Sequence, residues 1–229
     1  ASGLRAALEM TGREDVTVLS WAGDGGTFDI GFQSLSGAVE RNEDCIFVCY
    51  DNEAYMNTGV QRSSATPFGM RTTTTPGEGW KRTRKKNIVE ALAAHRIPYA
   101  ATASIGFPED MIAKFKKAKE MSGGSRFIHV LATCPPGWGI SSGASVKLAR
   151  LAVQTNVFPL YEVTDGIHYT LNYRGSHPVV DYLRAQGRFK HLTEKDCQTA
   201  QEMVSDDWRL LLKKTADTSP ALQNESGVL

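Results

Sequence analysis

The strongest constraint on the fold of this 229-residue chain is a pair of short apolar segments separated by a helix-length amphipathic segment. Residues 16–21 and 45–50 are rich in β-branched and aromatic residues, which is typical of buried strands. Between them, residues 27–40 place apolar side chains three and four positions apart, as one face of a helix requires. The pattern predicts a βαβ unit. Because such crossovers are right-handed and make the two strands parallel, the turns that follow both strands should open at the same edge of a sheet.

Polar residues follow both predicted strands. The turn Gly23-Asp24-Gly25-Gly26 comes after the first strand, and Asn52 comes after the second, 28 positions beyond Asp24. We therefore expect Asp24 and Asn52 to converge. Magnesium prefers octahedral oxygen coordination and takes its remaining ligands from phosphate and water. A carboxylate, a side-chain amide oxygen and a main-chain carbonyl, expected at Ala54, would suit this ion.

The glycines of the same turn predict a phosphate site beside the metal. Gly23, Gly25 and Gly26 can adopt backbone angles that are closed to other residues, and they let main-chain N–H groups approach an anion. They lead into the start of the predicted helix, where partial positive charge favours phosphate. A Gly-Asp-Gly tripeptide alone is common in turns. The paired strands and the spacing to Asn52 are what favour a magnesium-bound diphosphate.

Two sequence segments carry a family resemblance. The Gly-Asp-Gly turn with an asparagine 28 positions later is similar to the thiamine diphosphate motif of decarboxylases, transketolases and their relatives. Residues 51–67, which contain Tyr55-Met56-Asn57-Thr58-Gly59, look like a narrower family, the β subunit of pyruvate:ferredoxin oxidoreductase and of the other 2-oxoacid:ferredoxin oxidoreductases. The resemblance continues through residues 72–75, 101–104, 134–138 and 158–162, and so covers essentially the whole chain.

This resemblance implies an activity and a set of partners. The activity is oxidative decarboxylation of a 2-oxoacid with thiamine diphosphate and Mg²⁺, followed by electron transfer through [4Fe-4S] clusters to ferredoxin and acyl transfer to coenzyme A. The partners are α and γ subunits, with a δ subunit in some complexes, and a catalytic glutamate is expected from the α subunit. The family's asparagine at the position of Asn57 reaches cofactor and substrate, so Asn57 is the expected catalytic residue and Thr58 a further cofactor contact. From the residues alone, an ordinary turn is the alternative interpretation of Asn57-Thr58-Gly59, because asparagine and glycine favour turns.

The cysteines differ in what they predict. Cys134 closes an apolar run and precedes Pro-Pro-Gly, and from the residues alone it is an ordinary loop cysteine. The resemblance implies instead that Cys134 is the fourth ligand of a [4Fe-4S] cluster. Such a cluster needs four thiolates, so the other three are expected in an amino-terminal part that this chain lacks. The helix pattern that begins at Ala1 without a capping residue raises the same expectation. Cys45 and Cys49 lie roughly 13 Å apart along one strand and are expected to be buried structural thiols.

The rest of the chain predicts the fold class. Helices are expected at residues 86–94, 108–121 and 143–154 and within 176–212, strands at 97–101, 126–132 and 158–163, and a polar tail from residue 215. This alternation predicts an α/β fold, a mostly parallel sheet with helices on both faces, as one thiamine diphosphate-binding domain over residues 1–229. The aperiodic segment 61–86 predicts a functional loop that walls the active site and faces another subunit. Its basic run, residues 81–86, is expected to be a solvated face, with contact to coenzyme A phosphates as the alternative.

Composition narrows the class of protein. With 41% hydrophobic and 22% charged residues, the chain can bury the core of a globular enzyme subunit. Its formal net charge of +1 gives no electrostatic case for binding nucleic acid or a membrane. There is no run of 18 apolar residues and no signal-peptide pattern, so a cytoplasmic location is expected.

Alternatives remain open at this point. Pyruvate is the first choice of substrate, with 2-oxoisovalerate, phenylglyoxylate and oxalate as alternatives, and oxalate would remove the need for coenzyme A. A non-redox thiamine diphosphate carboligase or decarboxylase would share Asp24 and Asn52 but has no use for Cys134 as a cluster ligand. A noncatalytic binding module of flavodoxin-like or Rossmann type would tolerate the same glycine turn without binding thiamine diphosphate.

Overall fold

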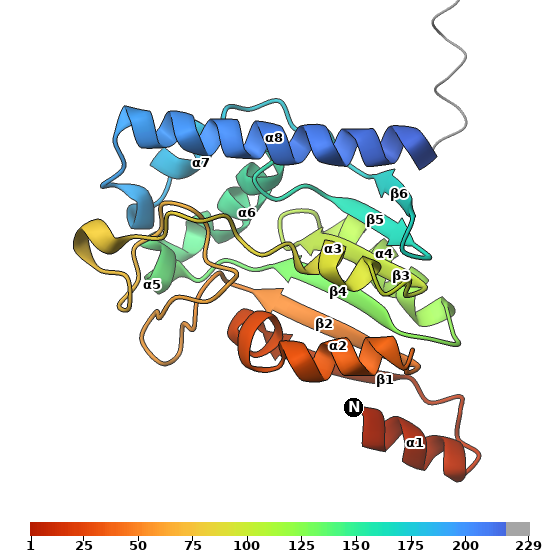
Figure 1. The fold of residues 1–229 in the computed structure, drawn as a ribbon. Coiled ribbons are helices and arrows are strands. Elements are labelled where there is room, and N and C mark those ends of the chain that lie inside the picture. Colours follow the sequence, from red (N-terminus) through yellow and green to blue (C-terminus); the bar gives the residue numbers. More distant parts are fainter. Residues whose placement is uncertain (219–229) are drawn as a thin grey trace, which may run out of the picture.

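The computed structural model describes residues 1–218 and contains a six-stranded sheet with the order β1-β2-β4-β3-β5-β6 (Figure 1). β1, β2, β4 and β3 run parallel to one another, whereas β5 and β6 are antiparallel to their neighbours. The strands are β1 Val18–Gly23, β2 Cys45–Asp51, β3 Tyr99–Ser104, β4 Arg126–Leu131, β5 Tyr161–Thr164 and β6 His168–Leu171. The expected α/β fold with a mostly parallel sheet is confirmed.

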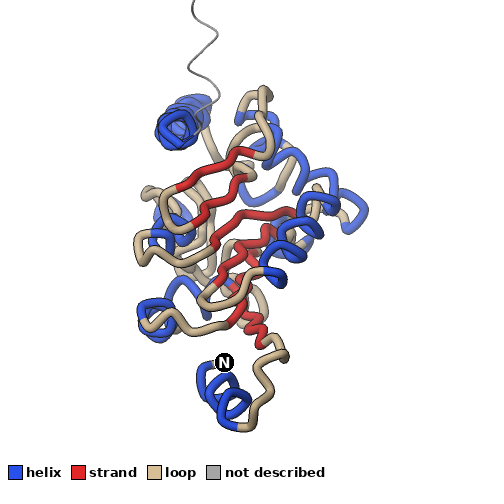
Figure 2. Tube along the Cα trace, turned by 90° about the vertical axis from the view of Figure 1, so that its right-hand side faces the viewer, coloured by secondary structure: helices blue, strands red, loops and turns tan. Residues whose placement is uncertain are grey.

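Helices cover both faces of the sheet (Figure 2). One face packs on α2 (Phe32–Glu40), α3 (Ile88–Ala93) and α8 (Glu194–Thr218), and the other packs on α4 (Pro108–Glu120). The remaining helices and turns are α1 Ser2–Met10, η1 Gly25–Ile30, η2 Gly77–Gly79, α5 Pro135–Trp138, η3 Ser142–Ala144, α6 Ser145–Gln154, α7 Val179–Arg184 and η4 Gly187–Phe189. In the described part of the chain, no helix is both long and apolar enough to cross a membrane.

A third apolar cluster joins α5, α6 and α7 to residues of the long segment between β2 and α3. Ala54, Met70 and Trp80 come from that segment, and they pack with Trp138 and Leu148. The segment is therefore an ordered part of the core, although it has almost no regular secondary structure. It lies at the end of the sheet where β2 and β4 finish, and this places it beside any site built on the carboxyl ends of those strands (Figure 1).

The central strands follow directly from composition, and the edge strand β1 does not. β2 and β4 are predominantly apolar because both of their faces are covered, and the sequence predicts each to within one residue at either end. β1 lies at an edge, where Leu19 is 46% and Trp21 is 56% exposed. The indole of Trp21 stacks on Tyr50 of β2 and on Phe115 of α4, so the three rings form an aromatic cluster of which Trp21 is the exposed member.

Several sequence-based expectations are wrong in detail. The first strand begins two residues later than expected, and the strand expected at residues 158–163 is Tyr161–Thr164. β6 was not expected, because four residues of alternating exposure carry little periodic signal. The tail expected to start at residue 215 is helical through Thr218, and its remainder lies outside the described residues. The division into one domain over residues 1–229 stays a prediction.

The helix expected at residues 27–40 is two helices. A π-helical turn, η1, starts at Gly25 directly after Asp24, and α2 begins only at Phe32. At the junction, a Cβ on Gly31 would lie 2.2 Å from the carbonyl oxygen of Gly26, so only glycine fits there. The helical segment therefore begins directly after Asp24, two residues earlier than the apolar pattern predicts.

Candidate functional site

Three oxygen atoms converge at the carboxyl edge of the sheet, where β1 and β2 finish side by side. Gly23 pairs with Tyr50 in the parallel register, so Asp24 and Asn52 leave the sheet together. With the amide oxygen of Asn52 turned inward, it lies 3.2 Å from Oδ1 of Asp24 and 2.9 Å from the carbonyl oxygen of Ala54. With the amide turned over, its nitrogen donates hydrogen bonds to both. Adjacent oxygens around an octahedral magnesium ion are about 3 Å apart, so this donor set fits Mg²⁺.

The backbone from Asn52 to Ala54 leaves one carbonyl for such an ion. The indole Nε1 of Trp138 donates to the carbonyl oxygen of Asn52 at 2.8 Å, and the hydroxyl of Thr66 donates to that of Glu53 at 2.8 Å. In the described chain, the carbonyl oxygen of Ala54 has only the Asn52 amide within reach. Glu53 has a φ of +72°, a left-handed conformation that is strained for a residue with a side chain. This turn separates the directions of the successive carbonyls.

Asp24 is buried in a polar environment. Its side chain is among those almost wholly removed from water, and the hydroxyl of Ser63 donates to its Oδ2 at 2.5 Å. Burial, and then the nearby negative charge of Asp51, raise the pKa of Asp24 to about 7, with Ser63 and Lys85 opposing the rise. A divalent cation beside the carboxylate would reverse this effect by favouring the charged form.

A buried network of charges lies behind the loop that carries Asn52. Asp51 accepts hydrogen bonds from Lys85 Nζ at 2.5 Å, from His129 Nε2 at 2.7 Å and from the backbone N–H of Glu53 at 2.8 Å. Glu53 also pairs with Lys85 at 3.0 Å and with Arg188 at 2.6 Å. Burial alone would raise the pKa of Asp51, but Lys85 and His129 outweigh burial and lower it to about 2. Burial lowers the pKa of His129, so its imidazole is neutral near pH 7.

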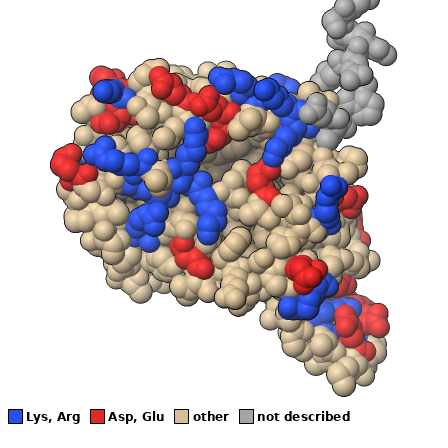
Figure 3. All heavy atoms as spheres, viewed as in Figure 1, with Lys and Arg blue, Asp and Glu red and all other residues tan. Residues whose placement is uncertain are grey.

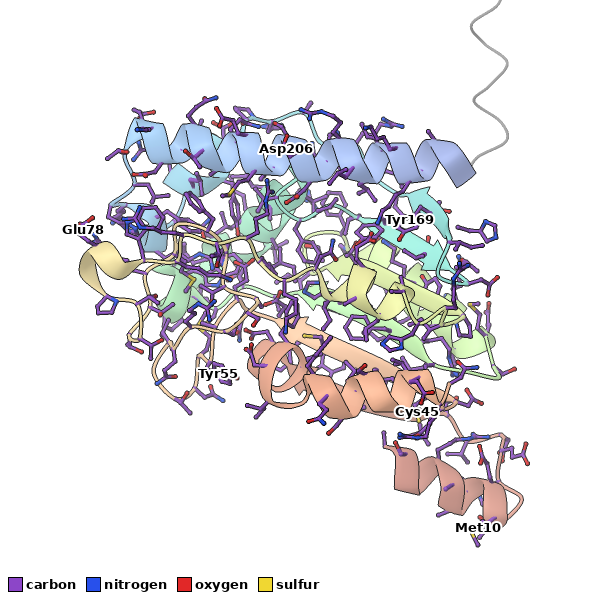
Figure 4. All side chains as sticks on the ribbon, in the orientation of Figure 1. Met10, Cys45, Tyr55, Glu78, Tyr169 and Asp206 are labelled. Carbon is purple, nitrogen blue, oxygen red and sulfur yellow. The ribbon has the colours of Figure 1, made fainter. Side chains whose placement is uncertain are left out.

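Gly25 is required because it has no side chain, and not because its backbone angles are unusual. Neither Gly23, Gly25 nor Gly26 has a positive φ, so the expected angular role is wrong. At Gly25 a Cβ would lie 2.2 to 2.5 Å from ring atoms of Tyr55, whose hydroxyl donates to the carbonyl oxygen of Gly25 at 3.1 Å. Tyr55 lies at the carboxyl end of β2 beside η1, at the opposite end of the strand from Cys45 (Figure 4). Only a glycine at position 25 lets this ring close over the turn.

Asn57 and Thr58 lie on an exposed turn. The hydroxyl of Thr58 donates to the side chain of Gln61 at 2.5 Å, and the backbone pairs Tyr55 with Gln61. Within residues 1–218 the side chain of Asn57 makes no hydrogen bond, and none links Asn57 or Thr58 to Asp24. The structure therefore brings Asp24, Asn52 and Ala54 together and leaves Asn57 and Thr58 on the surface beside them.

Cys134 is half-buried at the start of α5, on the same edge of the sheet. Its Sγ and the Sδ of Met56 both lie close to Gly137. At the other end of α5, the indole N–H of Trp138 donates a hydrogen bond to the carbonyl oxygen of Asn52. In the part of the chain that the structure describes, no group of three or more Cys, His, Asp or Glu side chains is arranged to hold a metal ion. Cys45 and Cys49 are fully buried, as expected.

The sequence missed residues that complete the site. They are Ser63, Lys85 and Arg188, which lie in segments without apolar periodicity. Ser63 falls within residues 51–67, which carry the family resemblance, but the sequence predicted no role for it. The expectation that residues 81–86 form a solvated face is right for the arginines and wrong for the lysines. Arg82 and Arg84 are exposed, but Lys81 is 4% exposed and the amino groups of Lys81, Lys85 and Lys86 turn inward.

Comparison with known proteins identifies a family for more than half of this chain. The family profile "Thiamine pyrophosphate enzyme, C-terminal TPP binding domain" matches residues 1–130, which include Asp24, Asn52 and Ala54. Thiamine pyrophosphate is the same compound as thiamine diphosphate.

Named relatives resemble nearly the whole chain. The ketoisovalerate oxidoreductase subunit VorB of Pyrococcus furiosus is 48% identical over 224 residues, which cover 93% of this chain and 71% of VorB. The pyruvate synthase subunit PorB of Methanothermobacter thermautotrophicus is 51% identical over 209 residues, covering 89% of this chain and 72% of PorB.

A solved structure shares the fold. It is the 2-oxoglutarate:ferredoxin oxidoreductase from Magnetococcus marinus with 2-oxoglutarate, coenzyme A and succinyl-CoA bound, and it superposes with a TM-score of 0.51 at 25% sequence identity. The match covers 64% of this chain and 57% of that chain.

Proposed function

Because this chain belongs to the thiamine pyrophosphate enzymes, in the family of the VorB and PorB subunits of 2-oxoacid:ferredoxin oxidoreductases, we propose that it is the subunit that holds thiamine diphosphate and Mg²⁺ in such an enzyme. The observation that carries this proposal is the convergence of the Asp24, Asn52 and Ala54 oxygens at 3.2 and 2.9 Å. These three would hold Mg²⁺, and the diphosphate and water would supply the remaining ligands.

The diphosphate would lie against the start of η1. The N–H groups of the first turn of a helix have no partner within the helix, and here they follow directly on the metal-binding Asp24. Gly25 and Gly26 keep side chains out of this approach, and Gly23 is the last residue of β1 before Asp24. When bound, thiamine diphosphate supplies the electron sink for decarboxylation of a 2-oxoacid. This chain's contribution is to fix the anionic end of the cofactor and to exclude water from Asp24.

Asn57 and Thr58 would act at the substrate side of the site. Their turn is exposed in this chain. It adjoins residues 52–54, the proposed metal loop, through Tyr55, which closes over Gly25. An exposed amide in this position can donate a hydrogen bond to a carboxylate or carbonyl oxygen of a bound 2-oxoacid. Asn57 is therefore the proposed catalytic residue of this chain, and Thr58 supports the turn through its bond to Gln61.

Cys134 would be one ligand of a [4Fe-4S] cluster, with three thiolates supplied from outside the described residues. It is half-buried, at the same sheet edge as the metal loop, and connected to that loop through α5. Electrons would pass through such clusters to ferredoxin, and the acyl group would pass to coenzyme A. Further subunits, α and γ and in some complexes δ, would complete the active site.

Short 2-oxoacids are the proposed substrates, with pyruvate first. Identity of 51% to the PorB subunit of a pyruvate synthase supports pyruvate, and identity of 48% to a VorB subunit supports branched 2-oxoisovalerate as the second candidate. A ferredoxin-linked assay of the assembled enzyme across both acids decides between them by the ratio of kcat/KM.

The cofactor assignment is tested by titrating the assembled enzyme, made with the full-length chain, with thiamine diphosphate in Mg²⁺ and in EDTA. Wild type should bind in Mg²⁺ only, and Asp24→Ala should lose binding while the subunits still assemble. Equal binding by Asp24→Ala, or none by wild type, contradicts the assignment and favours a noncatalytic module. Iron and acid-labile sulfide are then measured for wild type and Cys134→Ser. Iron in the wild type that is lost in the variant supports the redox enzyme and Cys134 as a ligand. Iron that is unchanged in the variant means that Cys134 is not a ligand, and a wild type without iron favours a carboligase or decarboxylase.

A further inference from the structure

Three lysines close together in sequence contact three different segments of the candidate metal site. They are Lys81, Lys85 and Lys86, near the end of the long segment between β2 and α3. Each amino group turns away from solvent toward oxygen atoms of a neighbouring segment. Neither the family profile nor the relatives' names give these residues a role.

Lys81 binds the turn that carries Ser63. Its Nζ donates to the carbonyl oxygens of Ser64, at 3.2 Å, and Thr66. The same turn delivers the hydroxyl of Ser63 to Asp24 and that of Thr66 to the carbonyl oxygen of Glu53. A cation buried beneath this turn therefore fixes two of the donors that orient the metal ligands.

Lys85 binds both residues that flank Asn52. Its Nζ donates to Asp51 at 2.5 Å and to Glu53 at 3.0 Å, so the amide of Asn52 is held between two anchored neighbours. Burial opposes the charge on Lys85, but Asp51 and Glu53 outweigh burial and raise the pKa of Lys85. The amino group thus stays charged, and removing it would leave two buried carboxylates short of a partner.

Lys86 binds the helix that starts after Asp24. Its Nζ donates to the carbonyl oxygen of Phe28 in η1 and lies 4.5 Å from the ring centroid of Phe32. The three lysines thus reach the η1 segment, the Asn52 loop and the Ser63 turn. These are the segments that carry or orient the Asp24, Asn52 and Ala54 oxygens.

We propose that Lys81, Lys85 and Lys86 form a lysine clamp that holds the metal ligands in register, with Lys85 as the positioning residue that sets the affinity for magnesium and thiamine diphosphate. The inference rests on the proposed function. Residues that hold metal ligands from behind typically change metal affinity 10- to 100-fold when removed, and an effect of that size is expected for Lys85.

A cavity beside Lys85 makes the idea directly testable. It has a volume of about 380 Å³, and its lining includes Lys85, Lys86, His129 and Phe158. Figure 3 shows a hollow below α8, edged by Lys and Arg side chains. The side chain of Lys85 is 21% exposed, and part of it borders this cavity. A small alkylammonium ion can enter a space of this size and take the place of a deleted amine.

The experiment measures the dissociation constant of thiamine diphosphate in saturating Mg²⁺ for the assembled enzyme by calorimetry. Lys85→Ala should bind 10- to 100-fold more weakly than wild type. Added n-propylammonium, which replaces the missing carbons and the amine, should restore a large part of the affinity. The neutral analogue n-propanol should restore none, because Asp51 and Glu53 need a cation.

Lys114→Ala is the matched control. Lys114 is 2% exposed and pairs with Asp110 at 2.7 Å on α4, on the opposite face of the sheet. Its loss removes a buried amine without touching the metal segments, so affinity should stay at the wild-type value with or without n-propylammonium. Thermal unfolding of both ligand-free variants measures how much fold stability each one loses.

The outcomes separate the clamp from the proposed function. If wild type binds and Lys85→Ala binds within twofold of it, the clamp inference is wrong and the proposed function stands. If Lys85→Ala loses affinity but n-propylammonium restores none, Lys85 supports the fold only and the clamp inference is again wrong. If wild type itself binds no thiamine diphosphate, the proposed function fails first.

Discussion

Binding of Mg²⁺ with thiamine diphosphate should weaken as pH falls below about 7, because the cation must displace a proton from Asp24. The pKa of this carboxyl is raised to about 7 by burial and by Asp51. At pH 8 about nine-tenths of the metal-free sites are deprotonated, and at pH 6 about one-tenth are. The apparent affinity should therefore fall about tenfold over this range, which is about 1.4 kcal/mol of binding free energy.

The assay is a calorimetric titration of the assembled enzyme with thiamine diphosphate in saturating Mg²⁺ at pH 6, 7 and 8. Asp24→Asn is the control for protons on the cofactor, because it keeps the shape of the side chain and has no proton to lose. The residual affinity of this variant for thiamine diphosphate should not show the tenfold fall between pH 8 and pH 6 that is expected for the wild type. Ser63→Ala removes the donor at 2.5 Å that favours the charged carboxylate, so the pH midpoint should move upward.

The same proton links pH to the stability of the metal-free protein. Between the ordinary carboxyl pKa and about 7, the folded state binds a proton at Asp24 that the unfolded state releases. The unfolding free energy should therefore decrease as pH rises through this window, by about 4 kcal/mol in total from this group. Urea unfolding of the metal-free protein measures the decrease. Saturating Mg²⁺ and thiamine diphosphate should abolish it.

Affinity that stays constant between pH 6 and 8 would refute the reasoning, since it would mean that Asp24 is already charged in the metal-free site. An equal pH step in Asp24→Asn would also refute it, because the proton would then belong to another group.

Three further predictions follow from the geometry. Gly25→Ala should weaken thiamine diphosphate binding at least tenfold by pushing the ring of Tyr55 off the turn, and the same change in a Tyr55→Ala background should have little added effect, as a double-mutant cycle by calorimetry would measure. Trp138→Phe leaves the carbonyl oxygen of Asn52 without its donor, and urea unfolding should show a loss of about 1–3 kcal/mol. Removing Mg²⁺ with EDTA should lower the melting temperature of the loaded wild-type enzyme but not that of Asp24→Ala, as differential scanning calorimetry can test.

The sequence was sufficient for the central features of the fold and for the convergence of Asp24 and Asn52, because both depend on local patterns. β2 and β4 are predominantly apolar, and the parallel βαβ rule predicts Asp24 and Asn52 at one edge of the sheet, where the structure places them. The family resemblance is confirmed by the profile match and by the VorB and PorB relatives. The metal, cluster and substrate roles of individual residues stay predictions.

The parts that the sequence did not predict depend on contacts between distant residues. Asp51 and Lys85 are 34 positions apart, and a basic residue in an aperiodic segment gives no local sign of whether it turns inward. Arg188 is still more distant from its partner Glu53. The π turn at Gly25 was missed because apolar spacing reports the buried face of a helix and not the width of its first turn.

The exposed Trp21 on the edge strand β1 has a practical consequence for anyone who handles this chain by itself. A strand at the edge of a sheet with a large apolar side chain that is 56% exposed favours pairing between molecules in concentrated solution. Overexpression without companion polypeptides should therefore yield aggregates. Production together with the other components of the assembly is the route to material that stays dispersed.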